Sequence, residues 1–438
     1  MGSLLTSTRA PCWAIAIMLT GLIACGSTDD ESTDDDGVCS ISDCPARCDH
    51  LVVQSCDVRT TACQDDIFAS VQCVWGETGT VPPTRVISEA EYQAYLEDPA
   101  NQDPPEDPAQ SAAWEWALHQ LLLLDPALTI EEAAGEFMGE AVAGYYDDEV
   151  GEVVIVDRGS QVQEATSMLA LGHEYVHALQ DQQISLRDLY DSTTTTDQQF
   201  TAAALVEGEA RLYEWLVTAF IYDISLSDLG LDGLFETDLK GSRTAVVMSD
   251  SPGLVAMFAL RYPVGAMYLD EVWESGGNSA VRSLYDAAPD TGLGWILGPS
   301  TFRDHPESWS EPLACAATGP DGYEELDYDE FGAPLLFAMR GGALNGNAVV
   351  PTLAAWQESL FWRGDQVLLY RDPAVDQWAL RWTIRFDASE QAADFAATAA
   401  AGLPALTVLV SDREVHLLSA SDPAVQVTWA DAVQQSCP

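Results

Sequence analysis

Two histidines spaced one helical turn apart constrain this chain more than any other feature. They belong to the segment His173-Glu174-Tyr175-Val176-His177, in a chain that contains only 6 histidines. On a helix, positions i and i+4 project from the same face, so both imidazoles can bind one zinc ion. Glu174 then stands beside the metal and can take a proton from a water molecule there. The spacing predicts a helix over about 163–183 that carries metal ligands and a general base.

A catalytic zinc ion usually has three protein ligands, so a third is needed. The pattern in which a third histidine follows on the same segment is excluded, because glutamine occupies position 183. A second helix, predicted over 198–220, contains Glu207 and Glu209 and leaves room for an antiparallel return past the first helix. Side chains two positions apart on a helix face different ways. One of the two glutamates should therefore reach the metal, and the other should be solvated or paired with a basic group.

On the strength of these residues, the chain resembles the gluzincin metallopeptidases. The combination HEYVH…EGEA is similar to the HEYxH…EGxA arrangement of bacterial collagenase-like and related families, specifically over about 143–216. A broader group of bacterial proteins with later PxxG and GG segments is also similar, here at Pro263–Gly265 and Gly276-Gly277. The resemblance implies zinc as cofactor and Glu207 as the third ligand. It also implies a peptide or protein substrate and hydrolysis of peptide bonds.

Two departures from the family pattern bear on this expectation. Arg211 stands where thermolysin-like members carry an aspartate that orients a zinc histidine, so the surrounding shell must differ, with Asp181 as a candidate. The segment 265–268 is not the aminopeptidase motif GxMEN, so we expect an endopeptidase. A side chain that stabilises the transition state is also expected, and a purely structural role is the alternative for each candidate. The candidates are Tyr262, Tyr268, His305 and Arg211.

The predicted fold class is α+β with a zincin-like core. Two strand-like runs within 143–156, joined by an acidic turn that ends in Gly151, predict a hairpin just before the histidine-bearing helix. In zincin-type proteases an edge strand above the active-site helix pairs with extended substrate. Val153–Val156 is our candidate for that edge strand, and a plain structural hairpin is the alternative.

The N-terminus predicts export. An apolar run from Trp13 to Ala24 fits a signal peptide over 1–24 and is too short to span a bilayer comfortably. Its end, Leu22-Ile23-Ala24-Cys25, resembles the bacterial lipobox, which implies that Cys25 carries lipid in the cell envelope, with a hint of the outer membrane. An ordinary cleaved signal is the alternative. Residues 25–38 are acidic and polar, and we interpret them as a disordered tether.

Eight further cysteines fit an oxidising compartment. Six of them fall within 39–80, which we predict to be a disulfide module whose connectivity the sequence leaves open. The remaining two are predicted to tie the C-terminus to the central domain. In chain order, the eight are Cys39, Cys44, Cys48, Cys56, Cys63, Cys73, Cys315 and Cys437.

The rest of the chain divides into a metallopeptidase domain over 81–335 and a small α+β domain over 336–438. In the second, the alternation of Trp378, Leu380 and Trp382 with intervening residues predicts a half-buried strand. A helix over 389–401 and strands over 406–410 and 415–419 should follow it. Proline-rich stretches at 78–84 and 98–108 are interpreted as linkers.

The strongly acidic composition excludes two classes of binding partner. With 18 basic and 70 acidic residues, the formal net charge is −52, which argues against binding to nucleic acid or docking on anionic lipid. The sequence therefore predicts an exported, lipid-anchored zinc metallopeptidase. Two alternatives stay open: a catalytically silent surface lipoprotein that binds a partner, and a zinc hydrolase of a non-peptide amide.

Overall fold

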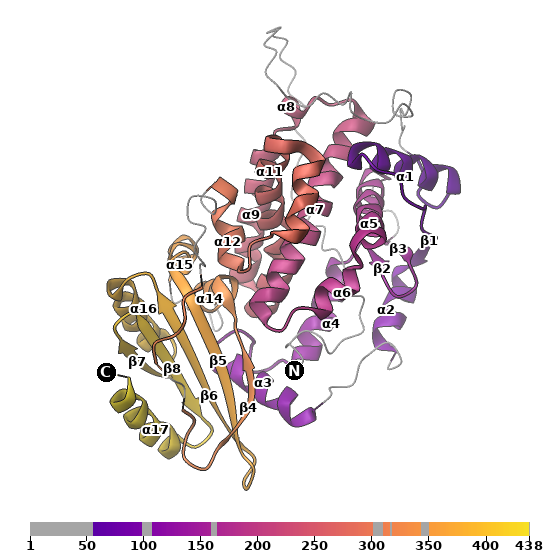
Figure 1. Ribbon diagram of the computed structural model, residues 1–438. Helices are drawn as coiled ribbons and strands as arrows, with labels where there is room; N and C mark the ends of the chain where they lie inside the picture. The colour runs from indigo at the N-terminus through magenta and orange to yellow at the C-terminus, as the bar shows by residue number, and fades with distance from the viewer. Residues whose placement is uncertain are drawn as a thin grey trace.

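The computed structural model describes residues 56–98, 107–158, 164–300, 310–315, 318–342 and 350–437. These residues form a mixed α+β protein with two sheets. A helical body carries the smaller sheet at its side, and a larger sheet extends from it, as Figure 1 shows. The predicted signal peptide, the tether and the site residues Cys25, Cys39, Cys44, Cys48 and His305 lie outside the described residues. None of the described helices is long and apolar enough to cross a membrane.

The helical body is built around three long helices, α5, α7 and α11, of which α7 packs on both of the others. Their bounds are Glu164–Ile184, Thr196–Tyr222 and Arg261–Ser283. Shorter helices surround them: α1 (Thr61–Trp75), α2 (Glu89–Glu97), α3 (Pro108–Gln120), α4 (Ile130–Ala141), α6 (Leu186–Asp191), α8 (Leu226–Leu229), α9 (Leu231–Met248), α10 (Pro252–Ala259) and α12 (Gly292–Leu297). The predicted helices over 163–183 and 198–220 are therefore present as α5 and α7. At α4, Thr129 and Glu132 form the reciprocal capping box that fixes its first turn.

The smaller sheet has the strand order β1-β3-β2, with bounds Thr84–Ser88, Glu152–Asp157 and Gly144–Asp147. The predicted hairpin is β2–β3, paired antiparallel from Gly144 opposite Ile155. The prediction that Val153–Val156 is an edge strand is wrong, because β1 pairs with β3 in parallel and makes β3 the central strand. The edge strand nearer to the histidines is β2, which packs with β3 against α5.

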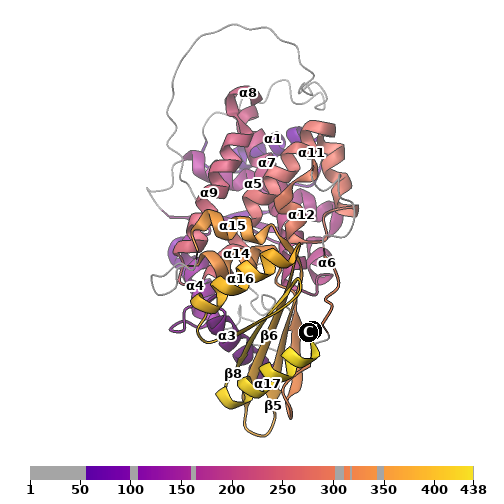
Figure 2. The same ribbon diagram turned by 90° about the vertical axis from the view of Figure 1, so that its left-hand side faces the viewer.

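The larger sheet is antiparallel, in the order β4-β5-β6-β8-β7. Its strands are β4 (Glu324–Asp329), β5 (Trp362–Asp372), β6 (Gln377–Phe386), β7 (Thr407–Ser411) and β8 (Glu414–Ala420), accompanied by α14 (Gly332–Gly341), α15 (Thr352–Ser359), α16 (Ser389–Gly402) and α17 (Pro423–Ser436). The domain boundary predicted at 335/336 falls inside α14, and the sheet begins earlier, at β4. Figure 2 shows this sheet extending below the helical body.

Strand β6 differs from its predicted half-buried state because helices cover both faces of the sheet. Trp382 faces the main core and meets Phe331 edge to face, at 5.3 Å between ring centroids. The other face packs on α17 through Trp429 and Val433. Even Arg381 and Thr383, on that second face, are buried. The polar residues of the alternation therefore do not mark a solvent face.

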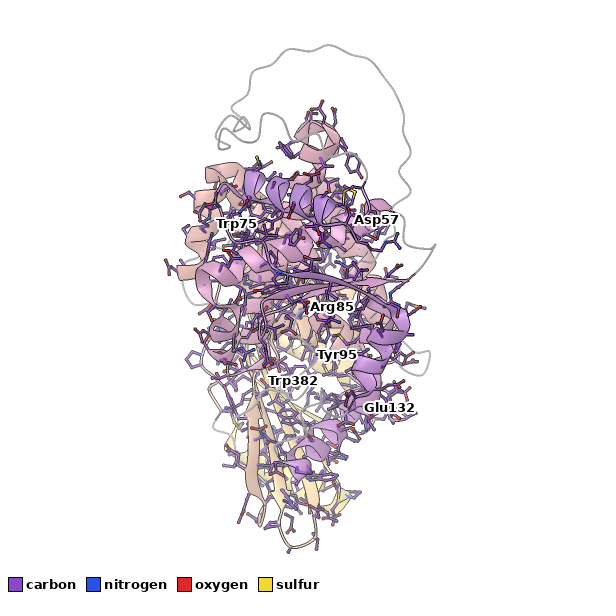
Figure 3. The ribbon with its side chains drawn as sticks, turned by 90° about the vertical axis from the view of Figure 1, so that its right-hand side faces the viewer. Asp57, Trp75, Arg85, Tyr95, Glu132 and Trp382 are labelled. Atoms are coloured by element: carbon purple, nitrogen blue, oxygen red, sulfur yellow. A yellow bond between two sulfur atoms is a disulfide. The ribbon has the colours of Figure 1, made fainter. Side chains whose placement is uncertain are left out.

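Helix α1 belongs to the core of the helical body. Phe68 packs edge to face on Tyr175 of α5, and Trp75 lies 4.7 Å from the ring of Tyr213 on α7. Figure 3 looks onto this helix, with Asp57 just before it and Trp75 at its far end. The described part of the predicted cysteine module is thus integrated with the helices that carry the histidines.

Two disulfides have both of their cysteines among the described residues. Cys56 pairs with Cys63 at the start of α1, with 5.6 Å between the Cα atoms. Cys315 pairs with Cys437, which confirms the predicted link to the C-terminus across a sequence separation of 122. Cys73 is disulfide-bonded as well.

Candidate metal centre

Helices α5 and α7 bring the predicted ligands together. His173 and His177 project from α5, and Glu207 projects from α7, which packs alongside it. All three side chains, and Glu174 between the histidines, have no solvent exposure. Buried imidazoles and carboxylates need hydrogen-bond or ion-pair partners, because water cannot reach them.

The ligand atoms of the three residues lie within 4.8 Å of one another. The Glu207 Oε2 atom is 3.3 Å from Nε2 of His173 and 3.3 Å from Nε2 of His177. Tetrahedral bonds of about 2.0–2.1 Å place ligand atoms roughly 3.3 Å apart. Both separations from Glu207 match this value, so the group could hold a metal ion.

His173 is oriented by a second carboxylate on α7. Its Nδ1 atom lies 3.1 Å from Glu214 Oε2, and Glu214 is held in turn by Arg211, at 2.6 Å. Arg211 also pairs with Asp238 of α9 at 2.6 Å. Glu214 accepts the Nδ1 proton, so a neutral His173 would carry its lone pair on Nε2, which faces Glu207.

His177 is oriented by an amide on its own helix. Its Nδ1 atom lies 2.8 Å from Gln180 Oε1, while Gln180 Nε2 donates to Val206 O at 3.0 Å and to Glu209 Oε2 at 2.9 Å. These donations fix the orientation of the amide, so Oε1 must accept from His177. In their neutral forms, both histidines would therefore direct an Nε2 lone pair to the side on which Glu207 Oε2 lies, as metal-binding histidines do.

Glu209 is turned away from the metal position, as its spacing from Glu207 requires. It was expected to be solvated or paired with a basic group, but it is buried and accepts hydrogen bonds from Gln180 and Tyr285. Burial raises its pKa to about 7, although both hydrogen bonds and nearby Arg282 oppose the shift. Its role in the structure is to hold the amide that orients His177.

The second oxygen of Glu207 faces a cation. Arg261 Nη2, at the start of α11, lies 3.0 Å from Glu207 Oε1, an ion-pair contact without the alignment of a hydrogen bond. Burial alone would raise the pKa of Glu207, but Arg261 and the two imidazoles hold that pKa below its ordinary value. The carboxylate is therefore ionised and ready to bind a cation.

Glu174 lies on the side of α5 that faces the small sheet. A Cβ atom added to Gly144, at the start of β2, would come within 3.5 Å of its Cγ atom. The pKa of Glu174 is raised well above its usual value by burial and by the neighbouring Glu207, while the backbone N–H of Tyr146 opposes the shift. Without a cation beside it, a carboxyl group in such surroundings favours its protonated form.

The four candidate stabilisers occupy different surroundings. The Tyr262 ring lies 6.0 Å from the ring of His173, so this residue borders the site. Arg211 pairs with Glu214 and Asp238, and it is connected to His173 through Glu214. Tyr268 packs on Trp295 with 4.7 Å between ring centroids, which is a core contact. His305 lies outside the described residues.

Asp181 does not orient a histidine. Its carboxylate accepts from the Tyr146 hydroxyl at 2.9 Å and from the backbone N–H of Leu186 at 2.9 Å, so it ties α5 to β2 and α6. The orienting residues that sequence reasoning missed are Gln180, Glu214 and Arg261. Helical spacing could have indicated the first two, since Gln180 lies three positions after His177 and Glu214 lies two turns after Glu207.

A second group with metal-ligand chemistry occurs in the larger sheet. Cys315, Cys437 and His416 lie close together, but the two sulfurs form a disulfide and offer no thiolate. Among the described residues, the group on α5 and α7 is therefore the better candidate.

Comparison with known proteins adds no relative. The chain matches no protein-family model, no curated protein and no solved structure.

Proposed function

We propose that this chain is an exported, lipid-anchored zinc metallopeptidase that cleaves within peptide chains. One observation carries the proposal. Two imidazole Nε2 atoms and one carboxylate oxygen converge within 4.8 Å, and Glu174 stands between the two histidines on the same helix. Two histidines and a glutamate are the protein ligands of a well-known class of catalytic zinc sites.

Zinc is the metal that this donor set favours. The 3.3 Å separations between Glu207 Oε2 and the two Nε2 atoms suit its tetrahedral geometry. Two neutral imidazoles and one carboxylate leave a position for a reactant. Because Nδ1 of each histidine is engaged by Glu214 or Gln180, the rings are held in place before metal arrives.

A bound zinc ion would polarise the scissile carbonyl and make a neighbouring water molecule more acidic. Glu174 takes the proton from that water as the oxygen attacks the carbonyl carbon. The same carboxyl group then gives the proton to the leaving amine as the C–N bond breaks. Tyr262 borders His173 and is the candidate to stabilise negative charge on the carbonyl oxygen.

The elements around the site support a zincin-like core. Helix α5 runs beside the small sheet, and β2 is an end strand of that sheet in the described part of the chain. An extended peptide could pair with β2 close to Glu174, since Gly144 lies against the Glu174 side chain. The proposed substrate-binding strand is therefore β2 in place of β3.

Export is supported by the covalent chemistry of the described residues. The pairs Cys56–Cys63 and Cys315–Cys437 are disulfides, which persist in oxidising compartments. Lipid attachment at Cys25 remains part of the proposal on the strength of its resemblance to the lipobox.

The full burial of the site favours one alternative, a structural metal in a protein without catalytic activity. His173, Glu174, His177 and Glu207 all have 0% exposure, so a substrate reaches them only if neighbouring groups move. A structural site usually has four protein ligands, however, and the group contains three. Glu174 would also have no purpose beside a purely structural metal.

Two measurements separate these functions. Wild-type protein loaded with zinc should cleave casein or a mixed peptide library, and the Glu174→Gln variant should keep one equivalent of zinc but lose the cleavage. Glutamine is close in size to glutamate and preserves packing while removing the proton acceptor. A zinc-loaded wild type that cleaves no peptide would contradict the peptidase proposal and favour the structural metal or a non-peptide amide as substrate.

A further inference from the structure

Arg261 is a buried cation directed at a proposed metal ligand. It begins α11, has 5% exposure, and lies 3.0 Å from Glu207 Oε1. Its guanidinium carbon lies 4.8 Å from the ring centroid of Phe258 and 5.2 Å from that of Tyr262. Contacts with two aromatic rings and a carboxylate hold the charge in one place.

The position of Arg261 follows from the crossing of α7 and α11. Gly208 and Gly265 lie backbone to backbone: a Cβ atom on Gly265 would come within 2.8 Å of Gly208 Cα. Glu207 is the neighbour of Gly208, and Arg261 lies one helical turn before Gly265. The glycine contact thus brings the start of α11 close enough for the guanidinium to reach the carboxylate.

The contact divides the two oxygens of Glu207 between different partners. Oε1 faces Arg261, and Oε2 faces the Nε2 atoms of His173 and His177 at 3.3 Å each. Rotation of the carboxylate would break the contact with a buried cation, which is unfavourable where water cannot replace it. Arg261 therefore limits Glu207 to one orientation, with a single oxygen directed at the histidines.

We propose that Arg261 is a positioning residue that fixes Glu207 as a one-oxygen ligand for the metal. The inference rests on the proposed metal site and names a residue that acts on the metal through Glu207. Residues that orient a metal ligand typically change metal affinity about 10–100-fold when they are replaced. The same magnitude is expected here, because the Glu207 carboxylate could rotate without Arg261.

The test measures zinc affinity by competition with a chromophoric chelator. Arg261→Gln should weaken zinc binding by roughly 10–100-fold. Arg261→Lys keeps the positive charge on a differently shaped side chain and should weaken zinc binding less. Arg340→Gln is the matched control. Arg340 has 1% exposure, pairs with Glu358 at 2.7 Å and lies over the ring of Phe395, but it is in the C-terminal part. The control should bind zinc as the wild type does.

A double-mutant cycle separates positioning from general loss of structure. If Arg261 acts through Glu207, Arg261→Gln should cause no further loss of zinc affinity in a Glu207→Gln background. Wild-type affinity in Arg261→Gln, or an equal loss in the wild-type and Glu207→Gln backgrounds, would overturn the positioning role while leaving the metal site intact. A wild type with no zinc affinity would overturn the metal site itself, and the positioning role with it. Circular dichroism of each metal-free variant identifies any that fail to fold.

Discussion

Gly208 of α7 lies directly against Gly265 of α11, so closely that a side chain on either residue would enter the backbone of the other helix. A Cβ atom on Gly208 would approach Ala266 N to 2.8 Å, and a Cβ atom on Gly265 would also meet Ala204 O. This crossing sets the distance between the helix that carries Glu207 and the helix that begins with Arg261. It gives a physical reason for the glycine in the EGEA segment.

The first prediction concerns this crossing. Gly265→Ala should lower the free energy of unfolding by roughly 3 kcal/mol or more, because the atoms in the way are rigid backbone. Gly135→Ala is the control: Gly135 lies within α4 and has open space around its missing Cβ atom. That substitution should raise stability by about 0.5–1 kcal/mol. Denaturant unfolding of the metal-free proteins measures both, and a Gly265→Ala variant as stable as the wild type would refute the close crossing.

The second prediction concerns the orientation of His173. Glu214→Gln should weaken zinc binding by about 10-fold or more, because the amide has no charge to hold the Nδ1 proton and Arg211 in place. Asp238→Asn should have a smaller effect, since Asp238 touches Arg211 and not the imidazole. Chelator competition measures both affinities. The graded order would be wrong if Asp238→Asn weakened binding as much as Glu214→Gln.

The third prediction concerns a group of buried acids where the helical body meets the larger sheet. Asp329 accepts from Thr196 N and Oγ1 at 2.7 and 2.6 Å, and Asp365 accepts from Phe331 N and Gly332 N at 2.9 and 3.0 Å. Burial raises the pKa of Asp329 to about 7 and that of Asp365 to about 6. The pKa of nearby Asp197 is raised as well, first by burial and then by Asp365.

A pKa that is higher in the folded than in the unfolded state means that folding favours the protonated form. The contribution of these acids to stability is therefore complete below about pH 4, the ordinary pKa of aspartate, and is lost as pH rises through about 6 to 7. Asparagine cannot ionise, so Asp329→Asn should reduce the loss of unfolding free energy over this pH range. The reduction should be about 1.4 kcal/mol for each unit by which folding raises the pKa of Asp329. The exposed Asp394→Asn control should follow the wild type. The test is to measure unfolding free energies from about pH 4 to pH 8. Parallel curves for the wild type and Asp329→Asn would contradict the contribution of Asp329.

Local patterns in the sequence predicted the elements that carry the site. The histidine spacing predicted a helix over about 163–183, which is α5, and the second helix predicted over 198–220 is α7. The spacing of His173 and His177 placed both imidazoles on one face of α5. Glu207 lies beside these histidines, as the resemblance implied. This contact was accessible from the sequence because α5 and α7 are close in the chain and pack on each other.

Contacts between distant segments were not predictable in the same way. Strand β3 is central because β1 pairs with it from a segment that we had interpreted partly as a linker. Strand β6 is buried on both faces because α17, near the end of the chain, covers the second face. Arg261 has no motif of its own, and its place beside Glu207 depends on the Gly208–Gly265 crossing. Each of these required knowledge of which elements meet in space.

The most direct test of the metal centre is the zinc content of purified protein. Wild type and Glu174→Gln should each retain about one equivalent of zinc after dialysis against buffer without chelator, whereas His173→Ala and His177→Ala should retain almost none, because a three-ligand site loses its metal when one ligand is removed. His119→Ala, which changes a histidine bonded to Leu128 O far along the chain from the site, should keep its zinc. A wild type without bound zinc, or a His173→Ala variant with undiminished zinc, would contradict the account.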